Sequence, residues 1–356
     1  MYKRQALDLA ALDSDVVIQL GPGVDANINV NNVETITANA MQSNTIIADN
    51  RFNRWVISGV NTGTIEDAIS PTSESTVRFE NFKNITGGAG DDNYIHLNSG
   101  SITGVIDGGS HTVLDFVDYS ALDNVTVHLG GAAGSIANIE RIIGNDVSST
   151  LVAADGVNNT WTITGVNDGD VAGVVFVDFN LLQGGDQQDI FNVNAGSATI
   201  MGGAGDDILR VSLTGTQIGH VSFDGEGHNA GDTVELIGGS SGYVGDFFSN
   251  VTGAADDQFL YTNGGNTFTV TYTNSETVLD DLLANTLRIN GTVSADTIDL
   301  LNQAFTVNGA RTVGYTSSRK TNLIVDGRES DDVINIQHNF SVTDALTLTS
   351  ETLSNT

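Results

Sequence analysis

Short runs of alternating or β-branched residues recur along the chain, separated by clusters of Gly, Asn and Asp. Examples are Val16–Leu20, Val125–Leu129, Phe268–Tyr272 and Val333–Ile336. Such runs with turn residues between them are typical of β-strands. An apolar period of 3.6 residues is visible only over Thr277–Ala284, which is the one segment that we expect to form a helix. The pattern therefore predicts a nearly all-β fold.

Long internal repeats organise these strands. Trp55–Gly63 matches Trp161–Gly169 in sequence, and Asn32–Ile36 matches Asn138–Ile142 at the same offset. The similarity fades beyond about residue 224. A repeat of this kind indicates a chain that stacks similar units. We expect three blocks: a first β-solenoid repeat over residues 6–117, a second over 118–223, and a divergent continuation over 224–356.

Many short strands fit either a solenoid or a row of sandwiches. In a parallel β-helix, Val, Ile and Leu form interior ladders, and Asn, Gly and Asp turn the corners between strands. The short strands, their large number and the tandem similarity favour this architecture. We therefore predict a right-handed parallel β-helix or β-solenoid, with tandem β-sandwich modules as the alternative.

The amino-acid composition argues against several classes of function and site. The 356 residues include 13 Lys plus Arg against 44 Asp plus Glu, a formal net charge of −31, which argues against nucleic-acid binding. The acids are 34 Asp and only 10 Glu, a bias toward turns and hard-cation ligands. The absence of Cys excludes disulfides and thiolate metal sites. No stretch approaches the roughly 20 apolar residues of a membrane-spanning helix.

The sharpest motif is Gly-Gly-Ala-Gly-Asp-Asp, present over Gly87–Asp92 and Gly202–Asp207, with a weaker version over Gly184–Asp189. These segments resemble the calcium-binding nonapeptide of RTX (hemolysin-type) proteins. Glycines there adopt left-handed turns and expose carbonyl groups, and the sixth-position Asp supplies a hard oxygen ligand. The resemblance implies RTX-like turns that recur every 18 residues on one side of the coil, which is the separation of Asp189 and Asp207.

We therefore predict Ca²⁺ as the cofactor. The predicted metal-site residues are Asp186, Asp189, Asp206, Asp207, Asp91, Asp92, Gly184 and Gly202. Other copies of the motif depart from the pattern: Gly108-Gly109 has Val113 where the Asp belongs, and Asp224–Asp232 reads as a motif broken by an insertion. Metal-free Gly-Asp corners of a β-helix stay open as the alternative.

No catalytic constellation emerges, and we predict that the chain is not an enzyme and has no catalytic residues. The basic residues are few, and we interpret them as solvated or charge-balancing, with Arg319-Lys320 in a polar loop. The six His residues share no motif, so we expect no zinc site. Trp55 and Trp161 could form a glycan-stacking platform, but we favour packing of each at a coil edge or cap.

The repeat texture resembles segments of large bacterial secreted or surface proteins of the filamentous-haemagglutinin and RTX-adhesin kind. This resemblance implies an extracellular or cell-surface structural and adhesive segment, with a cell-surface or glycan ligand as partner. A β-helix polysaccharide lyase or hydrolase, and an RTX-type secreted protein with its effector domain elsewhere, are the alternatives. Met1–Gln5 looks like a translated sequencing adapter, and we expect a piece of a longer gene.

Overall fold

The computed structural model describes residues 5–21, 28–30, 33–67, 76–130, 134–213, 218–250, 256–336 and 345–349. Apart from one 3₁₀ turn, Ser317–Arg319, every regular element in these residues is a β-strand. The prediction of an all-β fold is confirmed. No helix among the described residues is long and apolar enough to cross a membrane.

The chain forms two compact units, residues 1–154 with 173–181 and residues 155–172 with 182–356. The chain passes from one unit to the other at three points, and strand β20 (Leu181–Gln183) contains the last of them. The strands of the first unit are β1 (Ala6–Leu9), β2 (Val17–Leu20), β3 (Ile28–Val30), β4 (Thr35–Ala38), β5 (Thr45–Ile47), β6 (Asn53–Gly59), β7 (Thr62–Asp67), β8 (Thr76–Glu80), β9 (Asn84–Thr86), β10 (Asn93–His96), β11 (Ile106–Asp107), β12 (Phe116–Asp118), β13 (Thr126–Leu129), β14 (Ser135–Ala137), β15 (Arg141–Ile143), β16 (Thr150–Val152) and β19 (Val174–Val177).

The strands of the second unit are β17 (Thr160–Ile163), β18 (Gly169–Val171), β21 (Ile190–Val193), β22 (Gly196–Met201), β23 (Ile208–Leu213), β24 (Ile218–Asp224), β25 (Thr233–Gly239), β26 (Val244–Ser249), β27 (Asp257–Asn263), β28 (Asn266–Thr273), β29 (Thr277–Asn290), β30 (Thr297–Leu301), β31 (Ala304–Val307), β32 (Val313–Tyr315), β33 (Lys320–Asp326), β34 (Val333–Ile336) and β35 (Ala345–Thr349).

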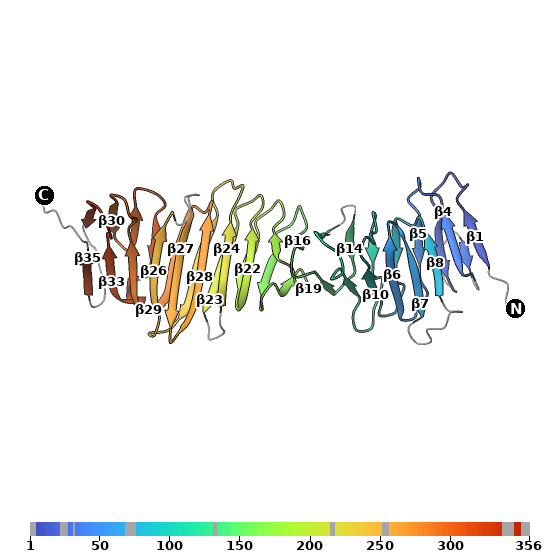
Figure 1. The fold of residues 1–356 in the computed structure, drawn as a ribbon, viewed down its shortest axis with the longest axis horizontal. Helices are drawn as coiled ribbons and strands as arrows, with labels where there is room; N and C mark the ends of the chain where they lie inside the picture. Colours follow the sequence, from blue (N-terminus) through green and yellow to red (C-terminus); the bar gives the residue numbers. More distant parts are fainter. Residues whose placement is uncertain are drawn as a thin grey trace. The chain divides into compact units, whose positions relative to one another are not determined.

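Most of the described strand pairs in both units are parallel, and most of these join segments that are tens of residues apart. In the first unit, β10 pairs with β6 (both labelled in Figure 1) and with β12, and β9 pairs with β5 and β11. Among the described strands, antiparallel pairs are confined to local connections such as β6–β7–β8 and β26–β27–β28. Sandwich modules are built from antiparallel sheets, so this pairing is consistent with a β-solenoid-like fold and favours it over the sandwich alternative. The three sequence blocks stay a prediction.

Register places one apolar residue from each coil in a continuous interior ladder. In the second unit the ladder runs through Trp161, Phe191, Leu209, Val234 and Val278, each directly opposite the next. In the first unit, Trp55, Tyr94, Val117, Ile142 and Phe176 are aligned in the same way. These side chains are at most 2% exposed. Since fully burying one large apolar side chain contributes about 1.5–3 kcal/mol, the ladders form the core.

The two tryptophans occupy matching places in these ladders. The Trp55 ring stacks on Tyr94 with centroids 5.6 Å apart, and the Trp161 ring stacks on Phe191 at 5.4 Å. Both indoles are completely buried. Both tryptophans therefore pack in the interior and not at a coil edge or cap as we predicted, and a glycan-stacking platform built on these residues is excluded.

Two local expectations were wrong. The expected helix over Thr277–Ala284 is the first part of strand β29, in which burial alternates with a period of two residues. Lys320 does not lie in a polar loop: it begins β33 and is completely buried. Its ammonium group donates hydrogen bonds to Asp280 Oδ1, at 2.9 Å, and to the Leu282 carbonyl.

Candidate functional site

The Gly-Asp motifs form turns in which the Asp carboxylate lies over the first glycine. A Cβ on Gly202 would be 2.6 Å from Asp207 Oδ2, and a Cβ on Gly184 would be 2.5 Å from Asp189 Oδ2. No real side chain tolerates such an approach, so these positions require glycine. Further turns with this five-residue spacing are Gly87/Asp92, Gly291/Asp296 and Gly327/Asp332. Sterics therefore explain the spacing of Gly and Asp.

In the second unit, these aspartates form a chain of hydrogen bonds from coil to coil. Asp189 Oδ1 accepts from the backbone N–H of Asn159 at 2.6 Å, and Asp207 Oδ1 accepts from the N–H of Asp189 at 2.7 Å. Asp232 Oδ1 accepts from the N–H of Asp207 at 2.7 Å. Glu276 Oε2 ends the series by accepting from the N–H of Asp232 at 2.8 Å. We call this series the second aspartate ladder.

The first unit contains an equivalent series, the first aspartate ladder. Asp92 Oδ1 accepts from the N–H of Asn53 at 2.8 Å, and Asp115 Oδ1 accepts from the N–H of Asp92 at 2.5 Å. Glu140 Oε2 accepts from the N–H of Asp115 at 2.7 Å. Both ladders therefore begin at an Asn and end at a Glu. Each carboxylate satisfies a buried backbone donor of the neighbouring coil.

The structure thus brings Asp189 and Asp207 together, as the spacing predicted, through a side-chain to backbone contact. Asp92 lies in the first aspartate ladder, and the three other predicted aspartates hold loops. Asp206 Oδ1 accepts from the N–H groups of residues 229, 230 and 231, and Asp91 Oδ1 accepts from those of Thr112 and Val113. Asp186 Oδ1 accepts from the N–H of Gly156. Whether these residues also ligate Ca²⁺ stays a prediction.

The second carboxylate oxygen is the distinctive feature of the ladders. Oδ2 is buried and has no hydrogen-bond partner within the described part of the chain at four ladder positions, namely Asp92, Asp115, Asp207 and Asp232. Leaving such a group unsatisfied costs about 1–3 kcal/mol, and more when it is charged. A proton on the carboxyl group, or a cation beside it, would remove this cost.

A serine in the same kind of turn indicates what the second oxygen faces. Gly144 and Ser149 repeat the five-residue spacing, and the Ser149 hydroxyl donates a 2.8 Å hydrogen bond to the Asp178 carbonyl. In the Asp207 turn, Oδ2 and the Gly225 carbonyl oxygen both lie within 2.7 Å of the ideal Cβ position on Gly202. In the serine turn, a hydroxyl donor thus faces a carbonyl acceptor. In the Asp207 turn, two acceptors, the carboxylate Oδ2 and the Gly225 carbonyl oxygen, lie at the corresponding place.

Burial dominates the acid strength of the ladder. Desolvation raises the pKa of Asp92 to about 8, that of Asp207 to about 7 and that of Asp115 to about 6. It also raises the pKa of Asp189 and Asp232. The ladder acids therefore hold protons at a pH where exposed aspartates have lost them.

The loop-capping aspartates behave in the opposite way. Hydrogen bonds from the backbone N–H groups of Val113 and Thr112 lower the pKa of Asp91. Those from Ala230, Gly231 and Asn229 do the same for Asp206. These two carboxylates therefore remain ionised and hold their loops through charge-assisted hydrogen bonds.

Two turns are two residues longer than the others, and sequence reasoning misread one of them. The Gly108 turn does not lack its aspartate, because Asp115 rather than residue 113 occupies the ladder position. In the turn that begins at Gly225, Asp232 occupies the ladder position, as expected for a motif that is lengthened by an insertion. Both longer turns read Gly-x-x-His-x-x-x-Asp, with His111 and His228 at the fourth place. The statement that the histidines share no motif was therefore wrong, and this repeated pattern was the available signal.

Three arginines of the described residues each pair with an acid. Arg54 contacts Glu66 at 2.8 Å, Arg78 contacts Glu80 at 2.9 Å, and Arg319 contacts Asp281 at 3.1 Å. The charge-balancing interpretation holds for these three residues.

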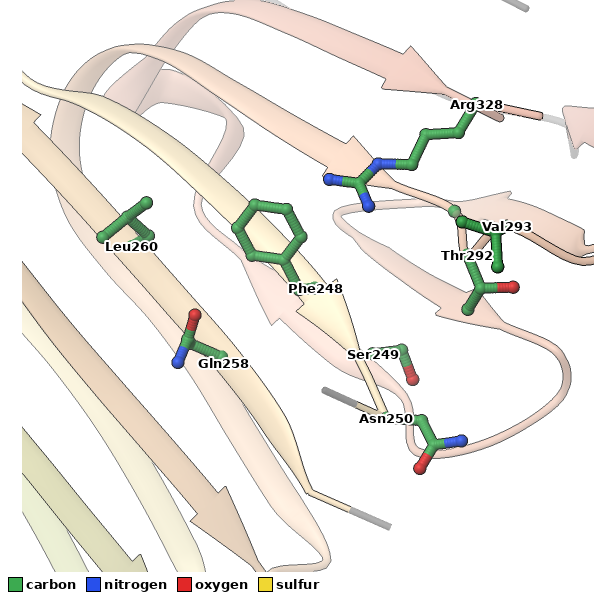
Figure 2. A pocket seen from close by; sticks show the side chains of 9 residues that line it. Phe248, Ser249, Asn250, Gln258, Leu260, Thr292, Val293 and Arg328 are labelled. Atoms are coloured by element: carbon green, nitrogen blue, oxygen red, sulfur yellow. The ribbon is translucent and has the colours of Figure 1, made fainter. Parts of the chain in front are cut away.

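One pocket, of about 380 Å³, opens in the second unit beside Phe248, Leu260 and Val293 (Figure 2). Among its described lining residues, Arg328 is the only charged one, and its guanidinium lies 5.0 Å from the Phe248 ring centroid. General acid–base catalysis needs a titratable side chain within reach of the substrate, and this lining contains no acid or histidine.

Comparisons with known proteins add no assignment: no protein-family model, no curated protein and no solved structure matches the chain.

Proposed function

We propose that this chain is a structural and adhesive segment of a large extracellular repeat protein of a bacterial surface. It folds as a right-handed parallel β-helix whose RTX-like Gly-Asp turns are stabilised by calcium. The two aspartate ladders carry this proposal. Their hydrogen bonds run from one coil to the next, so these conspicuous acids stabilise the stacking of coils.

The placement of the charged groups supports a structural role over a catalytic one. The ladder residues Asp92, Asp189 and Asp207 are completely buried, so no substrate reaches their carboxylates without displacing a coil. A lyase or hydrolase acting on acidic polysaccharide needs cationic and acidic groups that converge in an open groove. Arg54, Arg78 and Arg319 are instead each paired with a nearby acid.

The turns contain oxygen atoms of two kinds that ligate hard cations. Oδ2 of Asp207 and the Gly225 carbonyl are oxygen atoms near one point, and Oδ2 of Asp92 has the same relation to the Gly108 carbonyl. Carboxylate and carbonyl oxygens suit Ca²⁺. Bound calcium would neutralise the buried carboxylates, so Asp207 and Asp92 are the residues that would hold it. Asp189 would contribute by ordering the turn, since both of its oxygens accept backbone hydrogen bonds.

Calcium dependence is tested on the purified chain by thermal melts followed by far-UV circular dichroism, after EDTA treatment and Ca²⁺ titration, with Mg²⁺ at equal ionic strength as reference. The proposal predicts a Ca²⁺-specific rise in Tm that Asp207→Ala abolishes. The exposed Asp123 gives a matched control, because Asp123→Ala should keep the full response. An equal response to Mg²⁺, or no response, would leave the turns as metal-free corners.

The adhesive role is tested separately with immobilised glycans and whole cells. Saturable binding to a surface glycan without release of product supports an adhesive segment. Steady release of cleaved oligosaccharide from an acidic polysaccharide would overturn the proposal in favour of an enzyme.

A further inference from the structure

Each aspartate ladder ends in a cluster of one histidine and two carboxylates. In the first unit the cluster is His111, Asp115 and Glu140, and in the second unit it is His228, Asp232 and Glu276. Within each cluster, one ligand atom from each residue lies within 4.8 Å of the other two. The same three residue types therefore converge twice, once in each unit.

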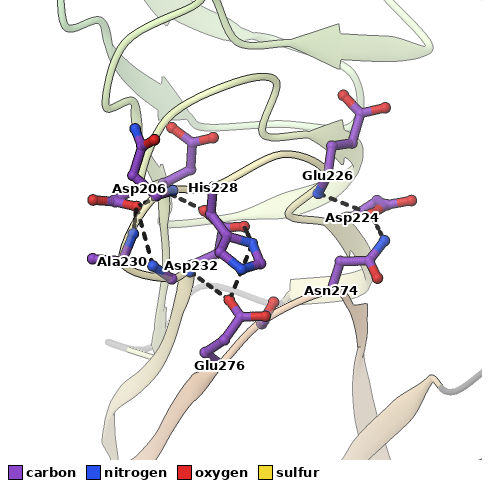
Figure 3. Close-up of polar contacts among 12 residues, drawn as sticks. Asp206, Asp224, Glu226, His228, Ala230, Asp232, Asn274 and Glu276 are labelled. Atoms are coloured by element: carbon purple, nitrogen blue, oxygen red, sulfur yellow. Dashed lines mark hydrogen bonds and ion pairs between the residues drawn. The ribbon is translucent and has the colours of Figure 1, made fainter.

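The distances match those between the ligands of one small metal ion. Nδ1 of His111 lies 3.7 Å from Asp115 Oδ2 and 3.2 Å from Glu140 Oε2. Nδ1 of His228 lies 3.5 Å from both Asp232 Oδ2 and Glu276 Oε2 (Figure 3). Two ligands that each lie about 2.0–2.2 Å from Zn²⁺ in a tetrahedral site are about 3.3–3.6 Å apart.

The buried aspartate oxygen independently points to a ligand. Asp115 and Asp232 are completely buried, and Oδ1 of each is occupied by the ladder hydrogen bond. Oδ2 of each is buried without a hydrogen-bond partner in the described residues and lies beside the histidine ring. The aspartate thus aims an unsatisfied oxygen into the cluster, which a shared metal ion would satisfy.

Hydrogen bonds from within the protein hold the loop that carries each histidine. Asp206 Oδ1 accepts from the N–H groups of Asn229 and Ala230, immediately after His228 (Figure 3). Asp91 Oδ1 does the same for Thr112 and Val113, immediately after His111. The Glu of each cluster is fixed by its hydrogen bond from the aspartate N–H. A pre-ordered site of this kind needs little rearrangement on binding.

We propose that the two clusters are a matched pair of divalent transition-metal sites of the zinc class. An imidazole nitrogen favours Zn²⁺, Ni²⁺, Cu²⁺ or Fe²⁺ over Ca²⁺ and Mg²⁺, and the two carboxylates balance the charge of a divalent ion. The histidine side chains are about one-third exposed, at 33% and 34%, so the ion has access from solvent. Three protein ligands leave a fourth position for water or for a group on a partner molecule.

The test uses the full, tag-free chain after removal of metal, titrated with ZnCl₂ by calorimetry and with Co²⁺ by visible absorption. Wild type should bind two equivalents, and His111→Gln or His228→Gln should bind one each. The double variant should bind none. His220 is exposed and outside both clusters, so His220→Gln should keep two.

The chemistry of the bound ion is tested in the same experiment. A hundredfold excess of CaCl₂ should not displace Co²⁺, which separates these sites from calcium at the Gly-Asp turns. Three results would overturn the proposal: no saturable Zn²⁺ binding, a stoichiometry that the histidine variants leave unchanged, or displacement of Co²⁺ by Ca²⁺. Far-UV circular dichroism of each variant confirms that lost binding is not lost folding.

Discussion

The backbone N–H of Asp189 donates a 2.7 Å hydrogen bond to Oδ1 of Asp207, which lies 18 residues later in the chain. Both residues are completely buried, so this bond lies between two coils and away from water. The carboxylate therefore replaces the solvent that the amide would otherwise need. Oδ2 of Asp207 has no hydrogen-bond partner in the described residues. Whether this oxygen is protonated, charged or beside a cation therefore decides how the turn responds to substitution, pH and metal.

Replacing Asp207 separates the roles of its two oxygens. Asp207→Ala should lower the free energy of unfolding by about 1–3 kcal/mol, because the Asp189 N–H stays buried without an acceptor. Asp207→Asn keeps that acceptor and adds an amide donor that can reach the Gly225 carbonyl. In EDTA at pH 8 it should therefore match or exceed the wild type in urea denaturation.

The exposed Asp123 provides the reference, since Asp123→Asn should shift the urea midpoint little. If Asp207→Asn is as damaging as Asp207→Ala, the accepted hydrogen bond is not what the turn needs.

The strand content and the core could be predicted because their signals are local. The matching Trp55 and Trp161 segments lie in equivalent interior ladders, as the repeat implies. The strand β29 was missed because Val278, Leu279, Leu282 and Leu283 mimic a helical apolar face. In the structure Asp280 points inward, where Lys320 and Tyr261 satisfy its carboxylate. Those partners lie 40 residues after and 19 residues before Asp280, so no local pattern reveals them.

The candidate sites were predictable only in part for the same reason. The 18-residue spacing located the Asp189–Asp207 contact, but it could not tell a shared ion from a side-chain to backbone bond. The histidine clusters draw their glutamates from later coils, with Glu140 25 residues after Asp115 and Glu276 44 residues after Asp232. Because these two separations differ, a search of the sequence for a fixed repeat does not show that the aspartate and the glutamate lie together.

In the absence of calcium, the protein should become less stable as the pH rises from 6 to 9. Burial raises the pKa of Asp92 from 3.8 to about 8, so the folded chain binds this proton more tightly than the unfolded chain does. The resulting stability is fully present below pH 3.8 and is lost as the pH rises through 8. Melts in EDTA across this range should show Tm falling, and Asp92→Asn should flatten the fall. A Tm that rises with pH would contradict this account.

His96 should determine how the stability of the protein falls at low pH. Burial lowers its pKa from 6.5 to about 4, so the unfolded chain takes up this proton first. The stability contributed by neutral His96 is present above pH 6.5 and is lost as the pH falls toward 4. His96→Phe, which keeps a ring against Tyr119, should reduce the acid loss of Tm relative to wild type. An unchanged acid limb would mean that His96 is not the group that titrates.

The buried Lys320 should stabilise the fold chiefly by balancing the charge of the buried Asp280 carboxylate. Lys320→Met leaves the Asp280 carboxylate buried without its cation, and the urea midpoint should fall by the equivalent of about 3–5 kcal/mol. Adding Asp280→Asn removes the stranded charge while keeping an acceptor for the Tyr261 hydroxyl, so the double variant should recover part of the loss. A loss below about 1 kcal/mol for Lys320→Met would show that the pair is not needed for folding.

Gly202 tests the steric basis of the Gly-Asp spacing. Gly202→Ala would place a methyl group 2.6 Å from Asp207 Oδ2 and 2.7 Å from the Gly225 carbonyl, so the turn must shift and the Tm should fall by several degrees. Combining it with Asp207→Ala removes one of the two clashing atoms. The loss of Tm in the double variant should therefore be smaller than the sum of the losses in the two single variants. Gly59→Ala is the matched control, since the nearest atom there is 3.9 Å away and the backbone angle is ordinary. Strict additivity in the double variant would mean that Gly202 is needed for backbone reasons unrelated to the aspartate above it.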